Sequence, residues 1–158
     1  MAKKTPQLAL RLDAANPDPA LRWCDGAAMA YLGGAVTLHL GTARKEAVLE
    51  QSVLHLPLPP EATPRQIQDA AEAWLRREAA RLIGEMLARQ SARLGRSMPG
   101  CSLSFATRAS WAVADGPDHL RCNWRLVEQA PAVMEQVLVQ ALVRLPVQSP
   151  CDDLFALA

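Results

Sequence analysis

Gln140 and Arg144 bear most directly on chemistry, because they lie four positions apart in an apolar segment with helical periodicity. Residues at this spacing share one side of an α-helix, so both would face the same ligand. The Arg144 guanidinium could bind a carboxylate or a phosphate. It could equally reach solvent at the helix end, where the helix dipole favours a cation.

His119 is the histidine with the clearest functional setting, since it directly follows an aspartate-rich turn at residues 115–118 and loops often carry function. A metal site built from His119, Asp115, Asp118 or Cys122 is one interpretation. Their order matches no metal motif, however, and strand alternation would turn Cys122 inward.

The other two histidines, His39 and His55, lie in predicted strands with no acid or histidine at ligand spacing. Hydrogen-bonded strand histidines are therefore the favoured interpretation. The cysteines are also scattered, with no CxxC pair: Cys24, Cys101, Cys122 and Cys151. In a reducing compartment they are expected to be thiols, and disulfides are the less favoured alternative.

The candidate residues are positioned by the segment 110–145, which combines a tryptophan loop, the aspartate-rich turn, a strand and a helix. The strand, residues 121–126, alternates between two faces: Cys122, Trp124 and Leu126 on one, Arg121, Asn123 and Arg125 on the other. Pro131 suits a first helical turn, and apolar residues then recur at helical spacing up to Leu145. Trp111 and Trp124 could form a stacking surface, although packing against this helix is favoured.

The order of tryptophan loop, N-W-R-L strand at residues 123–126 and proline-led apolar helix resembles the YgjP-like family of zinc metallopeptidases. These are also described as metal-dependent hydrolases and are related to the SprT-like zincins. A looser match begins at Asp25-Gly26 and Tyr31-Leu32-Gly33, so the resemblance spans residues 21–145.

The resemblance implies an α+β, zincin-like fold. Its parts would be an N-terminal antiparallel β-meander, a long amphipathic helix, further strands and a C-terminal core helix equivalent to the zinc-binding helix of the family. It also implies a single domain over residues 21–158, which we expect to follow a weakly ordered lead-in at residues 1–20.

The same resemblance shows where this chain departs from the family. There the helix ends H-E-L-x-H-L, so that two histidines bind zinc and the glutamate activates its water. Aligned without gaps, the histidines fall at Gln140 and Arg144, and the glutamate falls at Ala141. A third ligand falls at Pro150, which has no side-chain donor. The loop keeps Trp111 but not the flanking arginine, glycine and serine. The resemblance, together with these departures from the family pattern, implies a fold without zinc ligands, without a catalytic base and without a bound cofactor.

Short strands are predicted before the long helix. The turn pairs Asp25-Gly26 and Gly33-Gly34 delimit a hairpin-like region, followed by a strand at residues 35–40 with alternate apolar side chains. Another pair of strands is predicted at residues 47–51 and 53–58, and a further strand at residues 101–106.

A long helix is predicted from residue 63 to Leu94. Thr63 as N-cap, Pro64 at the first position and Gln66 closing a capping box mark its start, and Gly95 marks its stop. Its predicted apolar stripe is Ile67, Ala71, Trp74, Leu75, Leu82, Met86 and Leu94. Its arginines could touch a phosphate backbone, but a solvated face with i,i+4 ion pairs such as Glu72 with Arg76 and Glu85 with Arg89 is favoured.

Composition sets broad limits. The chain has 158 residues, half of them apolar, which fits one hydrophobic core. Lysine and arginine (17) nearly balance aspartate and glutamate (16), so net charge gives no reason to expect a nucleic-acid or membrane partner. The N-terminus has no signal-peptide or membrane-span pattern, and we expect a cytoplasmic location.

The leading hypothesis is a zincin-like protein that has lost catalysis and acts as a binding or regulatory module for an unknown protein or peptide partner. The candidate binding-face residues are Trp111, His119, Asn123, Arg125 and Arg144. One alternative is an active metal-dependent hydrolase with relocated ligands, His119 first among them. Another is a nucleic-acid-associated domain that uses the arginine-rich helix.

Overall fold

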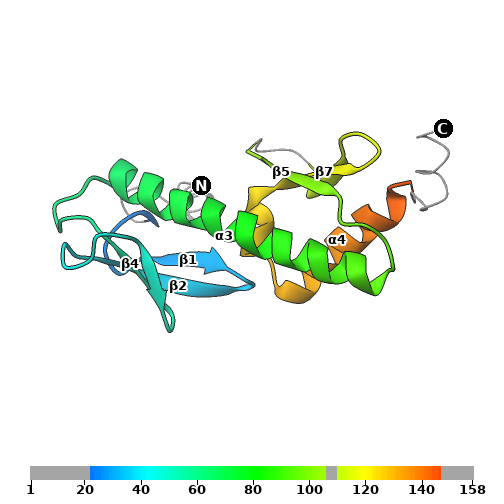
Figure 1. Cartoon of the computed structure of the whole chain (residues 1–158). Coiled ribbons are helices and arrows are strands. Elements are labelled where there is room, and N and C mark those ends of the chain that lie inside the picture. The colour runs from blue at the N-terminus through cyan, green and yellow to red at the C-terminus, as the bar shows by residue number, and fades with distance from the viewer. Residues whose placement is uncertain (1–21, 106–109, 147–158) are drawn as a thin grey trace, which may run out of the picture. The chain divides into compact units, whose positions relative to one another are not determined.

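The computed structural model describes residues 22–105 and 110–146, and it has the predicted α+β character (Figure 1). Within these residues lie two sheets and the helices α3 (Pro64–Arg93) and α4 (Pro131–Arg144). The chain divides into two compact units. The first is Ala35–Trp74 with the described residues up to Ala30; the second is Tyr31–Gly34 with the described residues from Leu75 onward. The predicted lead-in at residues 1–20 lies outside the described residues.

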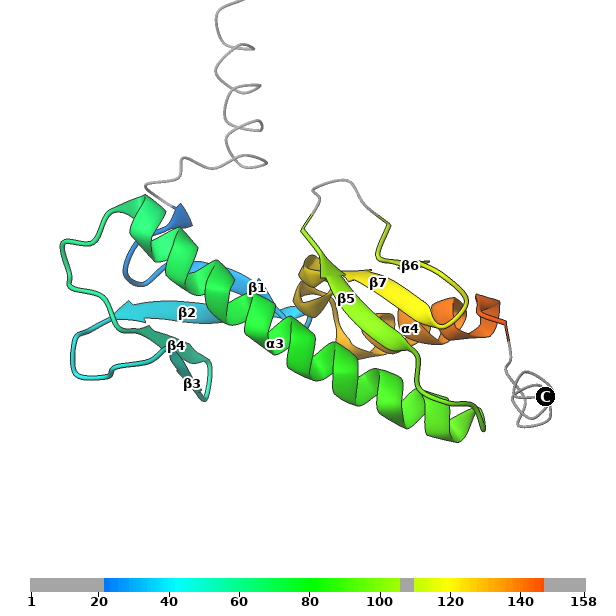
Figure 2. The same ribbon diagram turned by 45° about the horizontal axis from the view of Figure 1, so that its top comes forward.

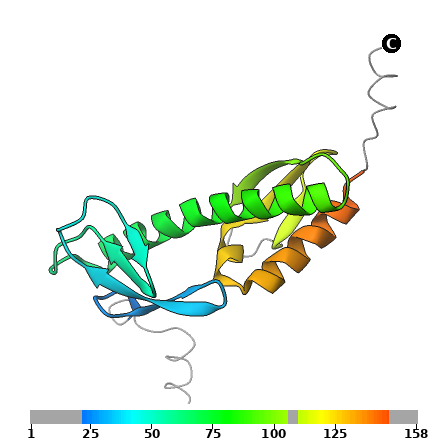
Figure 3. The same cartoon turned by 60° about the horizontal axis from the view of Figure 1, so that its bottom comes forward.

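The first unit contains a four-stranded sheet with the order β1-β2-β4-β3. Its strands are β1 (Ala28–Tyr31), β2 (Gly34–Leu40), β3 (Val48–Glu50) and β4 (Val53–Leu56). The predicted alternation in β2 is confirmed, since Val36, Leu38 and Leu40 are buried. Ile67, Ala71 and Trp74 are buried in the part of α3 that belongs to this unit, where the helix runs along the sheet (Figure 3).

The pairing of β2 with β4 differs from the antiparallel meander predicted for this region. The two strands are parallel, with Thr37 opposite Val53 and Leu40 opposite Leu56. β3 and β4 do form an antiparallel hairpin. β3 does not pair with β2. The next strand, β4, lies between β2 and β3 in the sheet and runs parallel to β2. A parallel pair needs a crossover connection, which local turn signals do not reveal.

Helix α3 begins and ends as predicted. The Gln66 amide N–H donates to Thr63 Oγ1 at 3.2 Å and the Thr63 N–H donates to Gln66 Oε1 at 2.9 Å, which forms the capping box. At the other end Gly95 has φ +67°, the left-handed conformation that commonly follows a helix.

The predicted apolar stripe of α3 is right in its first half and wrong at Leu82 and Leu94. Leu82 is half-buried and Leu94 is exposed. Met86 is buried as predicted, and the buried positions that the prediction omitted are Ala79, Ile83 and Leu87. They continue from Leu75 in steps of four, which keeps side chains on the same side of the helix.

The second unit contains a three-stranded sheet in the order β5-β7-β6 (Figure 2). Its strands are β5 (Gly100–Ser104), β6 (Ala112–Ala114) and β7 (His119–Asn123). The central strand β7 pairs parallel with β5 and antiparallel with β6. Helix α4 packs against β6 and buries Met134, Leu138, Ala141 and Leu142. The predicted C-terminal core helix is thereby confirmed.

The strand predicted at residues 121–126 ends early. β7 stops at Asn123, and Trp124–Glu128 form a 3₁₀ helix, η1. Asn123 Oδ1 accepts a hydrogen bond from the Arg125 amide at 2.9 Å and so caps η1. Asn123 is 3% exposed, so it does not lie on a solvent face. Strand alternation alone could not reveal this cap.

The turn between β1 and β2 is centred on Leu32 and Gly33, one residue earlier than the predicted pair Gly33-Gly34. Both central residues have positive φ, +49° and +79°, as type I′ hairpin turns require. The Leu32 amide donates to the Val127 carbonyl at 2.8 Å, and the Gly33 amide donates to the Glu128 carbonyl at 3.0 Å. The hairpin tip is therefore fixed to the segment that leads into α4.

Candidate functional site

The exposed side of α4 carries the two residues singled out by their spacing. Gln140 and Arg144 are both exposed, whereas Ala141 is 6% exposed. The two positions aligned with the family's zinc-binding histidines thus share an open side of the helix, and the position aligned with the family's glutamate points into the core. Arg144 forms no ion pair with any residue that the structure describes.

These residues do not fit a zinc ion. Gln140 offers a neutral amide, Arg144 offers a cation with no lone pair, and the methyl group of Ala141 is buried. Zinc requires thiolate, imidazole or carboxylate donors, and a cation at this position would repel it. The third predicted position, Pro150, lies outside the described residues. No catalytic step through zinc follows from this face of α4.

The edge strand β6 lies beside α4 and has an unpaired side. The Asn123 amide donates to the Trp111 carbonyl, and the Asp115 amide donates to the His119 carbonyl, each at 2.8 Å. Because backbone groups alternate along a strand, Ala114 directs its own N–H and C=O away from β7. Ala114 is exposed, and no described strand pairs with that side.

Exposed apolar side chains lie along and just before this edge strand. Trp111 is 40% exposed and Val113 is 42% exposed, and on α4 the side chain of Val143 is also open. The packing predicted for Trp111 is therefore not seen. Trp124, by contrast, is buried, as favoured from the sequence. Two guanidiniums lie near its ring, with Arg76 at 5.3 Å and Arg125 at 4.6 Å from the ring centroid.

The candidate metal residues around β7 are not brought together. His119 Nε2 lies 2.9 Å from Ser102 Oγ, and Asp115 Oδ2 accepts from Arg121 at 2.9 Å. The predicted inward orientation of Cys122 is confirmed, since it is fully buried. Among the residues that the structure describes, no three histidine, cysteine or acidic side chains are grouped to hold a metal.

The remaining binding-face candidate, Arg125, is half-buried. Its guanidinium forms an ion pair with Glu128 at 3.0 Å in addition to its stacking on Trp124. Arg125 therefore holds η1 together, and of the five predicted face residues Trp111 and Arg144 are the exposed ones.

The arginines of α3 are partly occupied within the fold. Arg65 pairs with Asp69 at 3.2 Å, and Arg81 pairs with Glu78 at 2.7 Å and with Glu85 at 3.3 Å. Pairing at the predicted i,i+4 spacing is therefore present, although Glu85 pairs with Arg81 rather than Arg89, and Arg76 stacks on aromatic rings. This pairing reduces the positive charge available to a nucleic acid.

A second cluster, which sequence analysis did not find, lies in the first unit. His39 and His55 are direct neighbours on β2 and β4, with ring centroids 5.3 Å apart. Glu50 Oε2 lies 3.8 Å from His55 Nε2, and Arg44 pairs with Glu50 at 2.7 Å. The histidines and Arg44 line a pocket of about 80 Å³. Only the register of the parallel pair could have revealed it.

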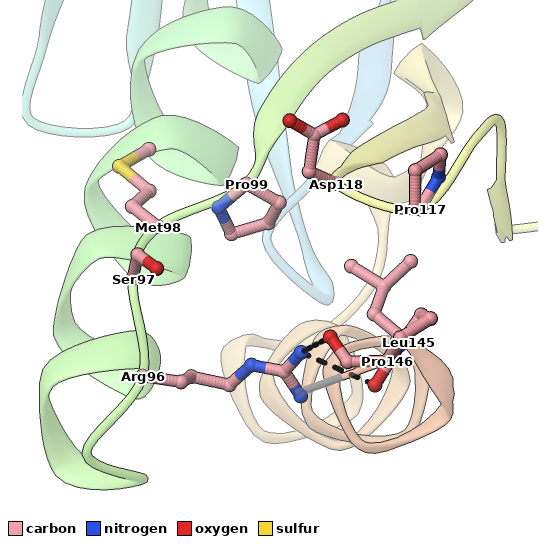
Figure 4. A pocket seen from close by; sticks show the side chains of 8 residues that line it. All are labelled: Arg96, Ser97, Met98, Pro99, Pro117, Asp118, Leu145 and Pro146. Carbon is pink, nitrogen blue, oxygen red and sulfur yellow. Dashed lines mark hydrogen bonds between the residues drawn. The ribbon is translucent and has the colours of Figure 1, made fainter. Parts of the chain in front are cut away.

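The C-terminal end of α4 closes another hollow, of about 160 Å³ (Figure 4). The Arg96 guanidinium lies at its base and donates to the carbonyls of Leu142, Leu145 and Pro146. Arg96 therefore satisfies carbonyls that the helix end leaves unpaired. Asp118 lines the opposite wall. The Arg96 cation in this hollow is therefore already hydrogen-bonded to the backbone at the end of α4.

Comparison with known families identifies the domain to which this chain belongs. The sequence profile described as "YgjP-like, metallopeptidase domain" matches residues 4–143, most of the chain. This match identifies a metallopeptidase-type domain. The chain belongs to the YgjP-like family, as its sequence resemblance predicted. Searches of curated proteins and of solved structures gave no match. In the described residues no helix is long and apolar enough to cross a membrane.

Proposed function

We propose that this YgjP-like domain is non-catalytic and binds an extended segment of a partner protein along β6, beside the exposed side of α4. The observation that carries the proposal is the composition of that side. Gln140 and Arg144 are exposed where the family resemblance predicts zinc ligands, and the predicted base position is the buried Ala141. An amide and a guanidinium recognise carboxylates; they do not activate water.

The backbone of β6 supports this mode of binding. An edge strand with a free row of N–H and C=O groups can accept another strand. Ala114 directs its groups outward, and the exposed Trp111 and Val113 offer apolar contact on the same short strand or just before it. Arg144 adds a cation on the neighbouring helix. A flexible, acidic protein segment matches this combination of features.

The two alternative functions receive less support. A hydrolase with relocated ligands needs a metal-binding group, and the described residues contain none. Nucleic-acid binding needs several available cations, but Arg65 and Arg81 are paired with acids and Arg76 stacks on Trp124. The non-catalytic binding role therefore remains the best-supported proposal.

The proposal is tested with fluorescein-labelled, carboxymethylated casein, an unfolded acidic protein. We expect the wild-type chain to raise its fluorescence anisotropy saturably and to leave it uncleaved on a gel. Ala114→Pro removes one outward N–H and should weaken binding about tenfold, a loss near 1.4 kcal/mol. The matched variant Ala114→Ser keeps the N–H and should bind normally. Arg144→Gln should also weaken binding and reduce its salt dependence.

Three outcomes would contradict the proposal. Chelator-sensitive cleavage of casein would favour the hydrolase alternative. Equal affinity of Ala114→Pro and Ala114→Ser would show that the outward edge of β6 is not used. Absence of any saturable binding by the folded wild-type chain would remove the proposed role altogether.

A further inference from the structure

Two cysteines lie next to each other in the sheet of the second unit. Cys101 is on the edge strand β5 and Cys122 is on the central strand β7, 21 positions later in the sequence. In the parallel register Cys101 is opposite Leu120 and Cys122 is opposite Leu103. The cysteines are therefore diagonal neighbours on one face of the sheet, and their Sγ atoms are 3.9 Å apart.

The two thiols differ in access to solvent. Cys101 is exposed, whereas Cys122 is fully buried. The hydrogen bond shared with the Cys122 thiol lowers the pKa of Cys101. The same hydrogen bond and burial together raise the pKa of Cys122. A small oxidant would therefore reach the sulfur that ionises more readily, with a protected second thiol directly behind it.

We propose that Cys101 and Cys122 form an oxidation site, at which a hydroperoxide converts the pair into a reversible disulfide between β5 and β7. The proposal rests on the sulfur separation and the difference in exposure, and it does not depend on the proposed binding function. An exposed thiol beside a second, resolving thiol is the arrangement that oxidation-sensitive cysteines share.

Oxidation of the Cys101–Cys122 pair to a disulfide takes two steps. The Cys101 thiolate attacks one peroxide oxygen, the O–O bond breaks, and the leaving hydroxide takes a proton to become water. Cys101 is now a sulfenic acid. The Cys122 sulfur then attacks the Cys101 sulfur as it loses its proton, the S–O bond breaks, and the departing hydroxide takes that proton. Two thiols have lost two electrons, and hydrogen peroxide has been reduced to two waters.

The fold permits the approach that the bond needs. A disulfide has sulfurs about 2.05 Å apart, so the 3.9 Å separation must shorten by roughly half. β5 is an edge strand whose only neighbour in the sheet order is β7, and Gly100 directly precedes Cys101. Rotation of the exposed Cys101 side chain with a small shift of this edge brings its sulfur toward Cys122, while the central strand stays in place.

The experiment uses the full-length chain, reduced and then treated with a few equivalents of hydrogen peroxide. Remaining thiols are blocked with iodoacetamide before trypsin digestion. The arginines place each cysteine in its own peptide, and the pair would appear as peptide 97–108 linked to peptide 122–125. We expect this linked species to be the main product, lighter than the two free peptides by two hydrogen masses and lost on reduction with dithiothreitol.

Variants assign the order of events. Cys101→Ser should slow oxidation of Cys122 about tenfold or more, because the remaining thiol is buried. Cys122→Ala should leave Cys101 as a sulfenic acid that a cyclic dione traps. Cys24→Ser is the matched control and should form the linked peptide at the wild-type rate. Far-ultraviolet circular dichroism shows whether each variant is folded, and the wild-type peptide map does not depend on any of them.

Other results would overturn the proposal. Oxidation of Cys101 to sulfinic acid without a link would show that Cys122 cannot reach it. A main product that links Cys101 to a different cysteine, or a link formed only in denaturant, would show that the native pair is not the site. Unmodified Cys101 and Cys122, under conditions that oxidise glutathione, would show that the pair does not react.

Discussion

Replacing Tyr31 with phenylalanine should destabilise the second unit by removing one hydrogen bond to a charged group. Tyr31 Oη donates to Glu78 Oε2 at 2.7 Å, and the Glu78 carboxylate also accepts from Arg81 at 2.7 Å. The Glu78 side chain is only 17% exposed. Hydrogen bonds to charged partners contribute about 1.5–3 kcal/mol. Because Arg81 would still satisfy the carboxylate, we expect the lower end, about 1.5 kcal/mol, for Tyr31→Phe.

The contribution of the Tyr31–Glu78 hydrogen bond to the free energy of unfolding should decrease at both acid and alkaline pH. Burial raises the pKa of Glu78, but hydrogen bonds from Arg81 and Tyr31 outweigh it and leave the pKa below its ordinary value. This stabilisation is present above the unfolded-state pKa and is lost as pH falls through the folded one. Burial, followed by the hydrogen bond to Glu78, raises the pKa of Tyr31. That contribution is present below the ordinary tyrosine pKa of about 10 and is lost as pH rises.

Two assays measure these effects. Urea unfolding followed by tryptophan fluorescence gives the free energy of unfolding of wild type and Tyr31→Phe at acid, neutral and alkaline pH. Since Tyr31 is the single tyrosine, the absorbance of tyrosinate reports on it alone. Glu78→Gln should move this titration back toward the ordinary pKa. A neutral-pH loss below about 0.5 kcal/mol, with an ordinary tyrosinate titration in folded wild type, would refute the reasoning.

Three further predictions concern the turn, the core and the positions aligned with the family's zinc ligands. Gly33→Ala should lower the free energy of unfolding by several kcal/mol more than Gly26→Ala. Both glycines have positive φ, but of the two only Gly33 would place a Cβ 2.8 Å from the residue before α4. Equal melting temperatures of the two variants would contradict this prediction. Leu138→Ala, at a fully buried site, should cost about 2–5 kcal/mol in urea unfolding. Gln140→His with Arg144→His should gain weak zinc affinity against a chromogenic chelator; no gain would argue against the family alignment.

The features that sequence predicted correctly are mostly local. The Thr63 and Gln66 capping box, the stop at Gly95 and the proline-led start of α4 depend on neighbours within a few positions. The inward side of β2 followed from its own alternation. The placement of Gln140 and Arg144 on one side of α4 followed from helical periodicity. Each of these features can be predicted from a short segment of the sequence and a regular helical or strand repeat.

The features that sequence missed depend on pairing between distant segments. The parallel register that puts His39 beside His55, and the one that brings Cys101 near Cys122, involve strands without a shared turn. Asn123 continued the strand pattern but used its side chain to start η1. A polar side chain that hydrogen-bonds to the nearby backbone can end a strand, and the alternation of polar and apolar residues does not reveal this.

The metal content of the purified chain tests the central claim most directly. The chain should be produced without a polyhistidine tag in zinc-containing medium, purified without chelator, and analysed by inductively coupled plasma mass spectrometry. Because Gln140 and Arg144 are poor ligands and Ala141 is buried, we predict far less than one zinc per chain. Close to one zinc per chain, retained through dialysis against EDTA by folded protein, would contradict the proposal that this YgjP-like domain is non-catalytic and has no zinc site.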